Sequence, residues 1–214
     1  MTVPLPSAAD EPRQLPAALH DLPAGGETQT AVLAGGCFWG VQGVFQHVDG
    51  VLDATSGYAG GSAETATYMA VESGRTGHVE AVRVTFDPQK ISFAKLLQIY
   101  FSAAHDPTQV DRQGLDVGPQ YRSMIFPQDA AQASVAADYI AQLDAAHVYG
   151  AKIATVIEPG KPFYKAELFH QDFMVKHPTN PDIVLNEQPK VEALKKLFPG
   201  LYREKPVLVA DRQG

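Results

Sequence analysis

The chain has 214 residues, a hydrophobic content of 45% and a formal net charge of −7, so it is long enough for one well-buried domain and too short for a second independent core. The acidic balance argues against a nucleic-acid or anionic-membrane partner, because both require clustered Lys and Arg. The single cysteine excludes an intramolecular disulfide, and no apolar run approaches the about 18 residues of a membrane helix. With no signal-peptide pattern at the N-terminus, we expect a cytoplasmic protein that acts as a monomer.

The two ends of the chain differ in composition from its middle. Residues 1–27 are rich in Pro, Ala, Gly and acidic residues without sustained periodicity, which predicts a flexible N-terminal arm. Leu15 to Leu22 could touch the surface of the domain, although nothing in this stretch indicates a core. We expect a single catalytic domain over residues 28–204 and a C-terminal tail over residues 205–214.

The first structured stretch contains the only cysteine and the only tryptophan, side by side in Gly35-Gly36-Cys37-Phe38-Trp39-Gly40. Residues 30–34 before it read as a short buried strand, and apolar residues after it recur at helical spacing as far as Val48. Cys37 should therefore lie at the start of a helix, where backbone N–H groups and the helix dipole favour a thiolate and lower the pKa below about 8.5. The alternative is that Cys37 is a small buried hydrophobic residue and Trp39 a core residue.

Strand and helix patterns alternate along the rest of the chain. Residues 79–86 alternate cleanly and predict the clearest strand, and Ser92 can cap a helix that follows. Further strands are expected over residues 51–58, 122–126 and 154–157, and helices over residues 93–101, 128–147, 166–175 and 191–198. Two long polar loops, residues 60–78 and 105–121, have the character of site loops. The fold class is α/β (α+β), with one mixed sheet covered by helices, either a two-layer, ferredoxin-like split β-α-β plait with much coil or a similar mixed arrangement.

Several polar residues are candidates for chemistry. Glu80 lies on the apolar face of the 79–86 strand, where a carboxyl group is costly unless it is protonated or hydrogen-bonded, so it is a candidate acid or else a solvated strand-end residue. Tyr68 and Tyr121 lie in the polar loops and could equally be packing residues. Asp116 has an equally good interpretation as a turn residue. The histidines lack ligand spacing and one cysteine cannot build a zinc site, so no metal is expected.

A set of short motifs then points to a family. They are Gly36-Cys37-Phe38-Trp39-Gly40, Gly57-Tyr58-Ala59-Gly60-Gly61, Thr67-Tyr68, Ser73-Gly74-Arg75-Thr76-Gly77-His78-Val79-Glu80, His105-Asp106-Pro107, Gln120-Tyr121-Arg122-Ser123 and His170-Gln171-Asp172. Together, and in this order, they resemble the type A family of peptide methionine sulfoxide reductases. The resemblance implies a two-layer α/β plait and the following roles: Cys37 as nucleophile, Glu80 as acid, Tyr68 and Tyr121 as hydroxyl donors, Phe38 and Trp39 as walls of a methyl pocket, and Asp116 on the polar side.

The resemblance also implies the reaction. A thiolate attacks the sulfoxide sulfur while an acid protonates the poorly leaving oxygen, which turns methionine-S-sulfoxide, protein-bound or free, into methionine and leaves Cys37 as a sulfenic acid. No bound cofactor is implied. Many members of the family carry further cysteines near the C-terminus that reduce this sulfenic acid, and this chain has none. We therefore expect an external thiol, either a thioredoxin-type or glutaredoxin-type protein or a small thiol, to act on Cys37 directly in the repair of oxidised proteins.

Three other functions fit parts of the pattern. A single-cysteine thiol peroxidase or redox sensor would use Cys37 without Glu80. A cysteine hydrolase or acyltransferase would pair Cys37 with His78 and Asp116. A non-catalytic module would use the Trp39 pocket to bind methionine-bearing peptides.

Overall fold

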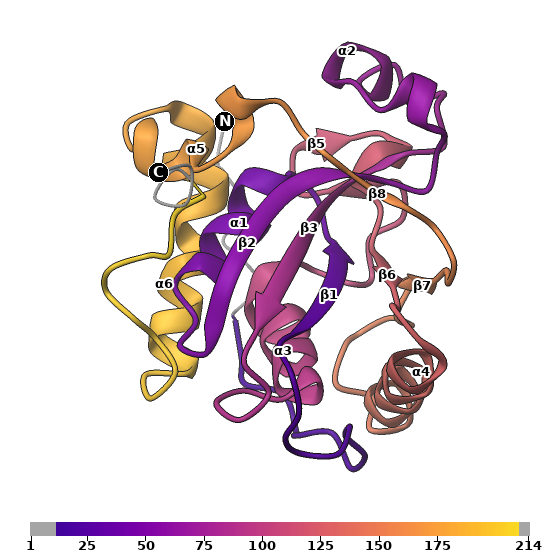
Figure 1. Ribbon diagram of the computed structural model, residues 1–214, viewed down its shortest axis with the longest axis vertical. Coiled ribbons are helices and arrows are strands. Elements are labelled where there is room, and N and C mark those ends of the chain that lie inside the picture. Colours follow the sequence, from indigo (N-terminus) through magenta and orange to yellow (C-terminus); the bar gives the residue numbers. More distant parts are fainter. Residues whose placement is uncertain (1–11, 210–214) are drawn as a thin grey trace.

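The computed structural model describes residues 12–209, and residues 1–11 and 210–214 lie outside the description. Within the described range the main sheet has six strands in the order β7-β6-β1-β3-β2-β8 (Figure 1). Their bounds are β1 Gln29–Ala34, β2 Val51–Ala59, β3 Val79–Phe86, β6 Met124–Phe126, β7 Val156–Ile157 and β8 Phe163–Lys165. A separate two-stranded ribbon pairs β4 (Arg112–Gln113) with β5 (Asp116–Val117).

The helices pack on this sheet and on one another. Their bounds are α1 Phe38–Gln46, α2 Tyr68–Val71, α3 Phe93–Ile99, α4 Ala130–Ala145, α5 Phe173–Lys176 and α6 Gln188–Leu197. A π-helical turn extends α3 over Tyr100–Ala104, and another precedes α6 over Ile183–Glu187. Helix α1 lies against β2, β3 and α6, whereas α3 contacts α4 (Figure 1). No helix within residues 12–209 is both long and apolar enough to cross a bilayer.

The four central strands form the expected plait. Strand β3 pairs antiparallel with both β1 and β2, and β1 pairs antiparallel with β6. Helix α1 therefore connects two parallel strands, β1 and β2, that are separated by β3, which is the split β-α-β connection. The order of these strands, which the sequence left open, results from this connection and from its counterpart through α3 between β3 and β6. The predicted α/β fold class is confirmed.

Alternation along β3 divides the interior of the protein. Val82, Val84 and Phe86 belong to the main core, which also contains apolar side chains of α1 and α3. Val79 and Ala81 face a smaller cluster on the other side of the sheet. Because successive strand residues point to opposite faces, Glu80 shares the main core face, as the alternation predicted.

One local prediction was wrong, and one strand was missed. Residues 166–175, expected as a helix, instead contain a 3₁₀ turn (Leu168–His170), Asp172 with a left-handed φ of 58°, and only then α5. A residue with a left-handed backbone ends a right-handed helix, so the spacing of apolar residues predicted one helix where the chain forms two short elements. Strand β8 was also missed, because it is short and pairs only with the end of β2.

The N-terminal segment is packed where the structure describes it. Leu15 is buried in the main core, its backbone N–H donates to Ser102 Oγ at 3.1 Å, and its carbonyl accepts from Gln98 Nε2 at 2.6 Å. The expectation of a flexible arm therefore does not hold for the segment around Leu15. Residues 1–11 of the expected arm lie outside the described part of the chain. In the expected tail, Val207 N–H donates to the carbonyl of Gln46 at 3.0 Å.

Candidate active site

Cys37 is the residue immediately before α1. The chain leaves β1 through Gly36, whose φ of 88° is favourable only for glycine, and a Cβ there would lie 2.5 Å from Gln113 Cγ. Cys37 occupies the helix N-cap position with a φ of −53° and a ψ of 123°, and its side chain is partly buried. The predicted strand, glycine turn and helix are all present.

Glu80 lies beneath the first turn of the same helix. Glu80 is 3% exposed, and its Oε2 accepts a hydrogen bond from the backbone N–H of Phe38 at 2.9 Å. Burial raises the pKa of Glu80 well above its usual range, and the nearby carboxylates of Glu72, Asp116 and Glu187 raise it further, while the Phe38 N–H opposes the shift. The site therefore favours the protonated form of Glu80, which is held one residue away from the cysteine.

The expected direction of the Cys37 pKa shift was wrong for the resting protein. The backbone N–H of Trp39 does favour the thiolate, as a helix start should, but burial of the thiol outweighs it. A thiolate would also be repelled by the carboxyl groups of Glu80 and Glu187 when they are ionised, and the pKa of Cys37 is raised well above its usual value. The sequence reveals the helix start but not the two carboxyl groups that distant segments bring to it.

The two expected hydroxyl donors lie around this pair. Tyr68 opens α2, and its backbone N–H donates to Glu167 Oε1 at 2.9 Å. Tyr121 ends a 3₁₀ turn, and its hydroxyl donates to Glu72 Oε1 at 3.2 Å. Burial raises the pKa of both phenols, and the charges of Glu80 and Cys37 contribute at each. Both hydroxyl groups therefore stay protonated and can donate hydrogen bonds.

Asp116 extends the acidic side of the site from strand β5. Burial raises its pKa and Lys190 lowers it, and the charge of Asp116 in turn raises the pKa of Glu80 and Tyr121. It therefore belongs to the same electrostatic cluster rather than only to a turn. Among residues 12–209, no group of three or more His, Cys, Asp or Glu side chains is arranged to hold a metal ion.

Aromatic rings form the other side of the site. Trp39 is partly buried and stacks on Phe173 with ring centroids 3.7 Å apart and an interplanar angle of 6°. Its indole N–H donates to Nδ1 of His170 at 3.1 Å. The ring of Phe38 is buried, 4.9 Å from that of His170, and Tyr68 lies 4.6 Å from His170 on another side. His170 thus lies at the centre of these rings.

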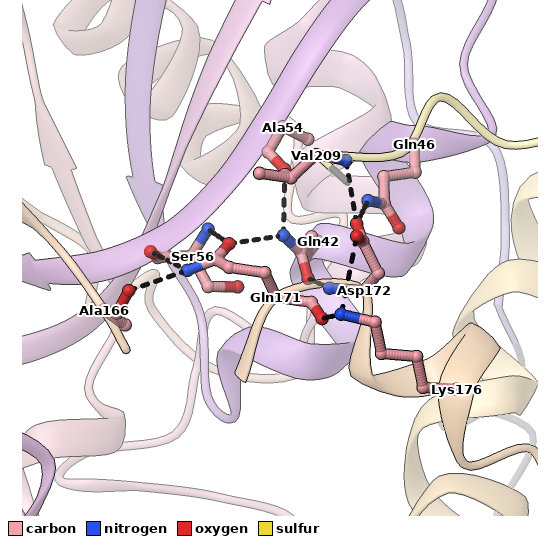
Figure 2. A network of polar contacts seen from close by, with 9 residues as sticks. All are labelled: Gln42, Gln46, Ala54, Ser56, Ala166, Gln171, Asp172, Lys176 and Val209. Atoms are coloured by element: carbon pink, nitrogen blue, oxygen red, sulfur yellow. Dashed lines mark hydrogen bonds and ion pairs between the residues drawn. The ribbon is translucent and has the colours of Figure 1, made fainter. Parts of the chain in front are cut away.

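A buried polar network holds the segment with His170 against α1 and β2 (Figure 2). The side chain of Gln171 accepts from Ser56 N–H and Gln42 Nε2, each at 3.0 Å, and donates to the Ser56 carbonyl at 2.9 Å. The next residue, Asp172, donates its N–H to Gln42 Oε1 at 3.0 Å and accepts from Gln46 Nε2 at 2.7 Å. Figure 2 shows these groups converging between the helix and the strand, so the position of His170 is fixed by its neighbours in sequence.

The family model for peptide methionine sulfoxide reductase matches residues 29–200. A protein of Mesorhizobium japonicum, named peptide methionine sulfoxide reductase MsrA 2, is 58% identical over 182 residues, which cover 85% of this chain and 93% of that protein. The chain belongs to the peptide methionine sulfoxide reductase family. It is therefore an oxidoreductase that reduces methionine sulfoxide to methionine, as the motifs predicted.

Solved structures agree with this assignment to the reductase family. Mxr1 from Saccharomyces cerevisiae in reduced form has a TM-score of 0.64 and 33% identity, covering 72% of this chain and 88% of that one. Methionine sulfoxide reductase A of Corynebacterium diphtheriae has a TM-score of 0.60 and 30% identity, covering 82% and 92%. All the predicted site residues of this reductase fall inside the span that the family model matches.

Three residues around the site were missed: His170, which contacts Trp39, Phe38 and Tyr68, and the charged pair of Glu187 and Lys190. His170 belongs to one of the motifs and to the expected 166–175 helix, but it was given no role in the site. Its signal was present in the His170-Gln171-Asp172 run, whereas Glu187 and Lys190 had no recognisable signal in the sequence. By contrast, His78 is not a base for Cys37, since its Nδ1 accepts from Gly61 N–H at 3.1 Å and its Nε2 lies 2.9 Å from the Ser62 carbonyl. This geometry does not support the hydrolase arrangement.

Proposed function

We propose that this reductase acts on the S epimer of methionine sulfoxide, with Cys37 as nucleophile and Glu80 as the acid that protonates the sulfoxide oxygen. The single observation that carries the proposal is the buried carboxyl of Glu80, hydrogen-bonded to the backbone N–H that follows Cys37. A buried carboxyl keeps its proton at neutral pH, and a well-placed general acid contributes about 10²–10⁴ in rate.

The proposed substrate position follows from the two sides of the site. The S-methyl group lies against the ring of Trp39, with Phe38 beneath it, and the oxygen faces the hydroxyl groups of Tyr68 and Tyr121. These hydroxyls stabilise the negative charge that grows on the oxygen. Asp116 helps to keep Glu80 protonated, because its charge raises the pKa of that carboxyl.

In the first half of the reaction, the oxygen atom passes from the methionine sulfur to Cys37. The cysteine sulfur is oxidised by two electrons to a sulfenic acid, and the sulfoxide sulfur is reduced by two electrons to the thioether. In the second half, an external thiol condenses with the sulfenic acid, releases water and forms a mixed disulfide. A second thiol then reduces this disulfide and returns Cys37.

The test is to incubate the protein with the separated S and R epimers of methionine sulfoxide and dithiothreitol, and to follow methionine by chromatography. Turnover of the S epimer alone, lost in Cys37→Ser, supports the proposal. No turnover of either epimer by protein with reduced Cys37 overturns it. Replacing dithiothreitol by thioredoxin, glutaredoxin or glutathione, each with its recycling system, identifies the thiol. Comparing free with peptide-bound sulfoxide defines the substrate.

A peroxidase or sensor is the remaining competitor. Both functions need a reactive Cys37 sulfur, but only the reductase uses a buried acid beside it, so the contact of Glu80 with the Phe38 N–H supports the reductase. Glu80→Gln separates the two functions, because it should slow sulfoxide reduction steeply and leave oxidation of Cys37 by hydrogen peroxide nearly unchanged. The peptide-binding module is tested by Cys37→Ser, which would retain full function in that case.

We also propose that the protein acts as a monomeric single domain in the cytoplasm. The need to keep one cysteine reduced supports this location. Size-exclusion chromatography with light scattering, and fractionation of cells that express a tagged chain, test the two parts separately.

A further inference from the structure

A buried ion pair lies at the start of α6, outside the site that the sequence predicted. Lys190 Nζ is 2.7 Å from Glu187 Oε2, and the two side chains are 15% and 2% exposed. Burying two charges is costly unless they are paired and well placed. Neither residue has a role in the reaction described above, so the position of the pair needs a reason.

The pair packs on the first turn of the helix that follows Cys37. A Cβ at Gly40 would overlap Glu187 Oε2 and would lie 3.2 Å from Lys190 Cδ. Cys37 and Gly40 are three residues apart and therefore lie on the same side of the helix. The ion pair, which contacts Gly40, is thus on the same side as Cys37. Glycine at position 40 therefore allows the ion pair to approach the cysteine.

Several charges act on Cys37 from the elements around it. Glu80 of β3 and Glu187 oppose a negative charge on the sulfur, whereas Lys190 favours it. The phenols of Tyr68 and Tyr121 lie in the same electrostatic environment, and the charge of Lys190 also acts on Asp116 of β5. Lys190 is thus the cation that offsets a surrounding set of acidic groups.

We propose that Lys190, held by Glu187, is a positioning residue that directs a positive charge toward the Cys37 sulfur when it must leave as a thiolate. The inference rests on the proposed function, in which an external thiol regenerates the enzyme. The thiolate of a second thiol attacks the sulfur of the external thiol in the mixed disulfide, and a new disulfide forms between these two thiols. The bond to the Cys37 sulfur breaks, and its electron pair stays on Cys37 as a thiolate. Such an exchange is faster when the leaving thiol has a lower pKa. With no second cysteine in the chain, Cys37 must be the leaving group in this step.

The test measures the pH at which Cys37 becomes half reactive toward iodoacetamide, which needs no sulfoxide. Lys190→Met should raise this midpoint by about one pH unit, as expected for the loss of one nearby charge, and Glu187→Gln should lower it because Lys190 is then unpaired. Lys190→Arg should restore the wild-type midpoint. Lys196→Met removes an exposed charge from the same helix and serves as the matched control.

The opposite signs of the two shifts distinguish this proposal from a structural role. An ion pair that only stabilises the fold would move both midpoints in the same direction or neither, and that result overturns the proposal. If Lys190→Met does not fold, the polar variant Lys190→Gln takes its place: a higher midpoint supports the proposal, and an unchanged or lower one contradicts it.

A second measurement addresses the regeneration step itself. Cys37 is first converted to a mixed disulfide with glutathione, and its reduction by dithiothreitol is followed by mass spectrometry at fixed pH. Lys190→Met should slow this release several-fold, whereas Lys196→Met should not. Release at the wild-type rate in Lys190→Met overturns the proposal. Because neither measurement uses sulfoxide, failure of the proposed reductase reaction would be recognised separately.

Discussion

The indole N–H of Trp39 donates to Nδ1 of His170 across 3.1 Å, joining the first turn of α1 to a segment 131 residues later. A histidine nitrogen that accepts is unprotonated, so the proton of the neutral ring is on Nε2. Burial lowers the pKa of His170, and the ring therefore stays a neutral acceptor at physiological pH. This bond orients the only tryptophan of the chain beside the expected nucleophile.

His170→Phe should keep the ring packing and remove the acceptor. We expect kcat/KM for the sulfoxide to fall about tenfold, since one unpaired buried donor costs about 1–3 kcal/mol, and the fluorescence of Trp39 to shift. His170→Asn, whose side-chain oxygen can take the place of Nδ1, is the control and should recover part of both signals. Wild-type kinetics and fluorescence in His170→Phe would show that the hydrogen bond does not position Trp39.

Glu80→Gln should be less active and more stable than the wild type. The folded pKa of Glu80 is raised above its ordinary value of 4.5, so the native state binds the proton more tightly than the unfolded state does. Above pH 4.5 the unfolded state releases this proton first, and stability falls as the pH rises, by up to about 1.4 kcal/mol per pH unit until the folded pKa is reached. Glutamine avoids this loss and can still accept from the Phe38 N–H.

Urea denaturation of both proteins between pH 5 and pH 8 checks this prediction. The stability gain of Glu80→Gln should grow with pH, while sulfoxide reduction falls about 10²–10³-fold. A gain that is independent of pH would mean that Glu80 is ionised in the folded protein and is not the acid.

His105 should determine part of the acid sensitivity of the fold. Burial lowers its pKa to about 3, and its ring lies between the Tyr100 carbonyl at 3.1 Å and Ser123 Oγ at 2.7 Å. At a pH below 6.5, the ordinary pKa of histidine, His105 binds a proton in the unfolded state but not in the folded state. Stability therefore falls as the pH drops from 6.5 toward 3, by about 1.4 kcal/mol per pH unit.

Replacing the histidine isolates this contribution. His105→Asn should be less stable at pH 7, because hydrogen bonds are lost, but its stability should decline less steeply between pH 6 and pH 4. His177→Asn changes an exposed histidine and should follow the wild-type curve. Parallel curves for His105→Asn and wild type would rule out the buried neutral ring as the cause.

Two helix glycines in α1 should respond differently to alanine. Alanine is normally better than glycine in a helix by about 0.5–1 kcal/mol, but at position 40 its Cβ overlaps the buried Glu187 carboxylate. At position 43 it meets the flexible end of Met174, with Cε at 2.7 Å. We expect Gly40→Ala to destabilise by about 1–3 kcal/mol and Gly43→Ala to cost clearly less, both measured by thermal denaturation. Equal effects would show that the ion pair can move away from α1.

The elements that could be predicted well from the sequence are those whose own residues show a local pattern of burial or capping. Strand β3 alternates between buried and half-buried residues from Val82 to Phe86, and Ser92 caps α3 by accepting from Lys95 N–H at 3.1 Å, so each could be recognised locally. The acid could be found for the same reason, because a carboxyl on the apolar face of β3 is a local anomaly. Cys37 stood out as the only cysteine, within a glycine turn.

What sequence could not provide depends on contacts between distant segments. The sign of the Cys37 pKa shift depends on Glu80 and Glu187, which only the folded chain brings to the helix start. The break between His170 and α5 depends on Asp172, whose left-handed backbone is compensated by bonds to Gln42 and Gln46 of α1 (Figure 2). Neither effect leaves a periodic pattern in the chain.

The packed N-terminal segment means that the span matched by the family model and the span packed into the core have different boundaries. The family match begins at residue 29 and ends at residue 200. Leu15, which precedes this span, nevertheless packs in the main core. Val209, which follows it, donates its N–H to Asp172 Oδ1 at 3.0 Å. A fragment trimmed to the matched span would keep all the chemical groups discussed above. It would nevertheless lose the buried Leu15, whose burial stabilises the fold by about 2 kcal/mol. It would also lose the Val209 contact that helps to hold Asp172 and, with it, His170. A fragment chosen by family homology would therefore hold the active-site residues in a less stable fold.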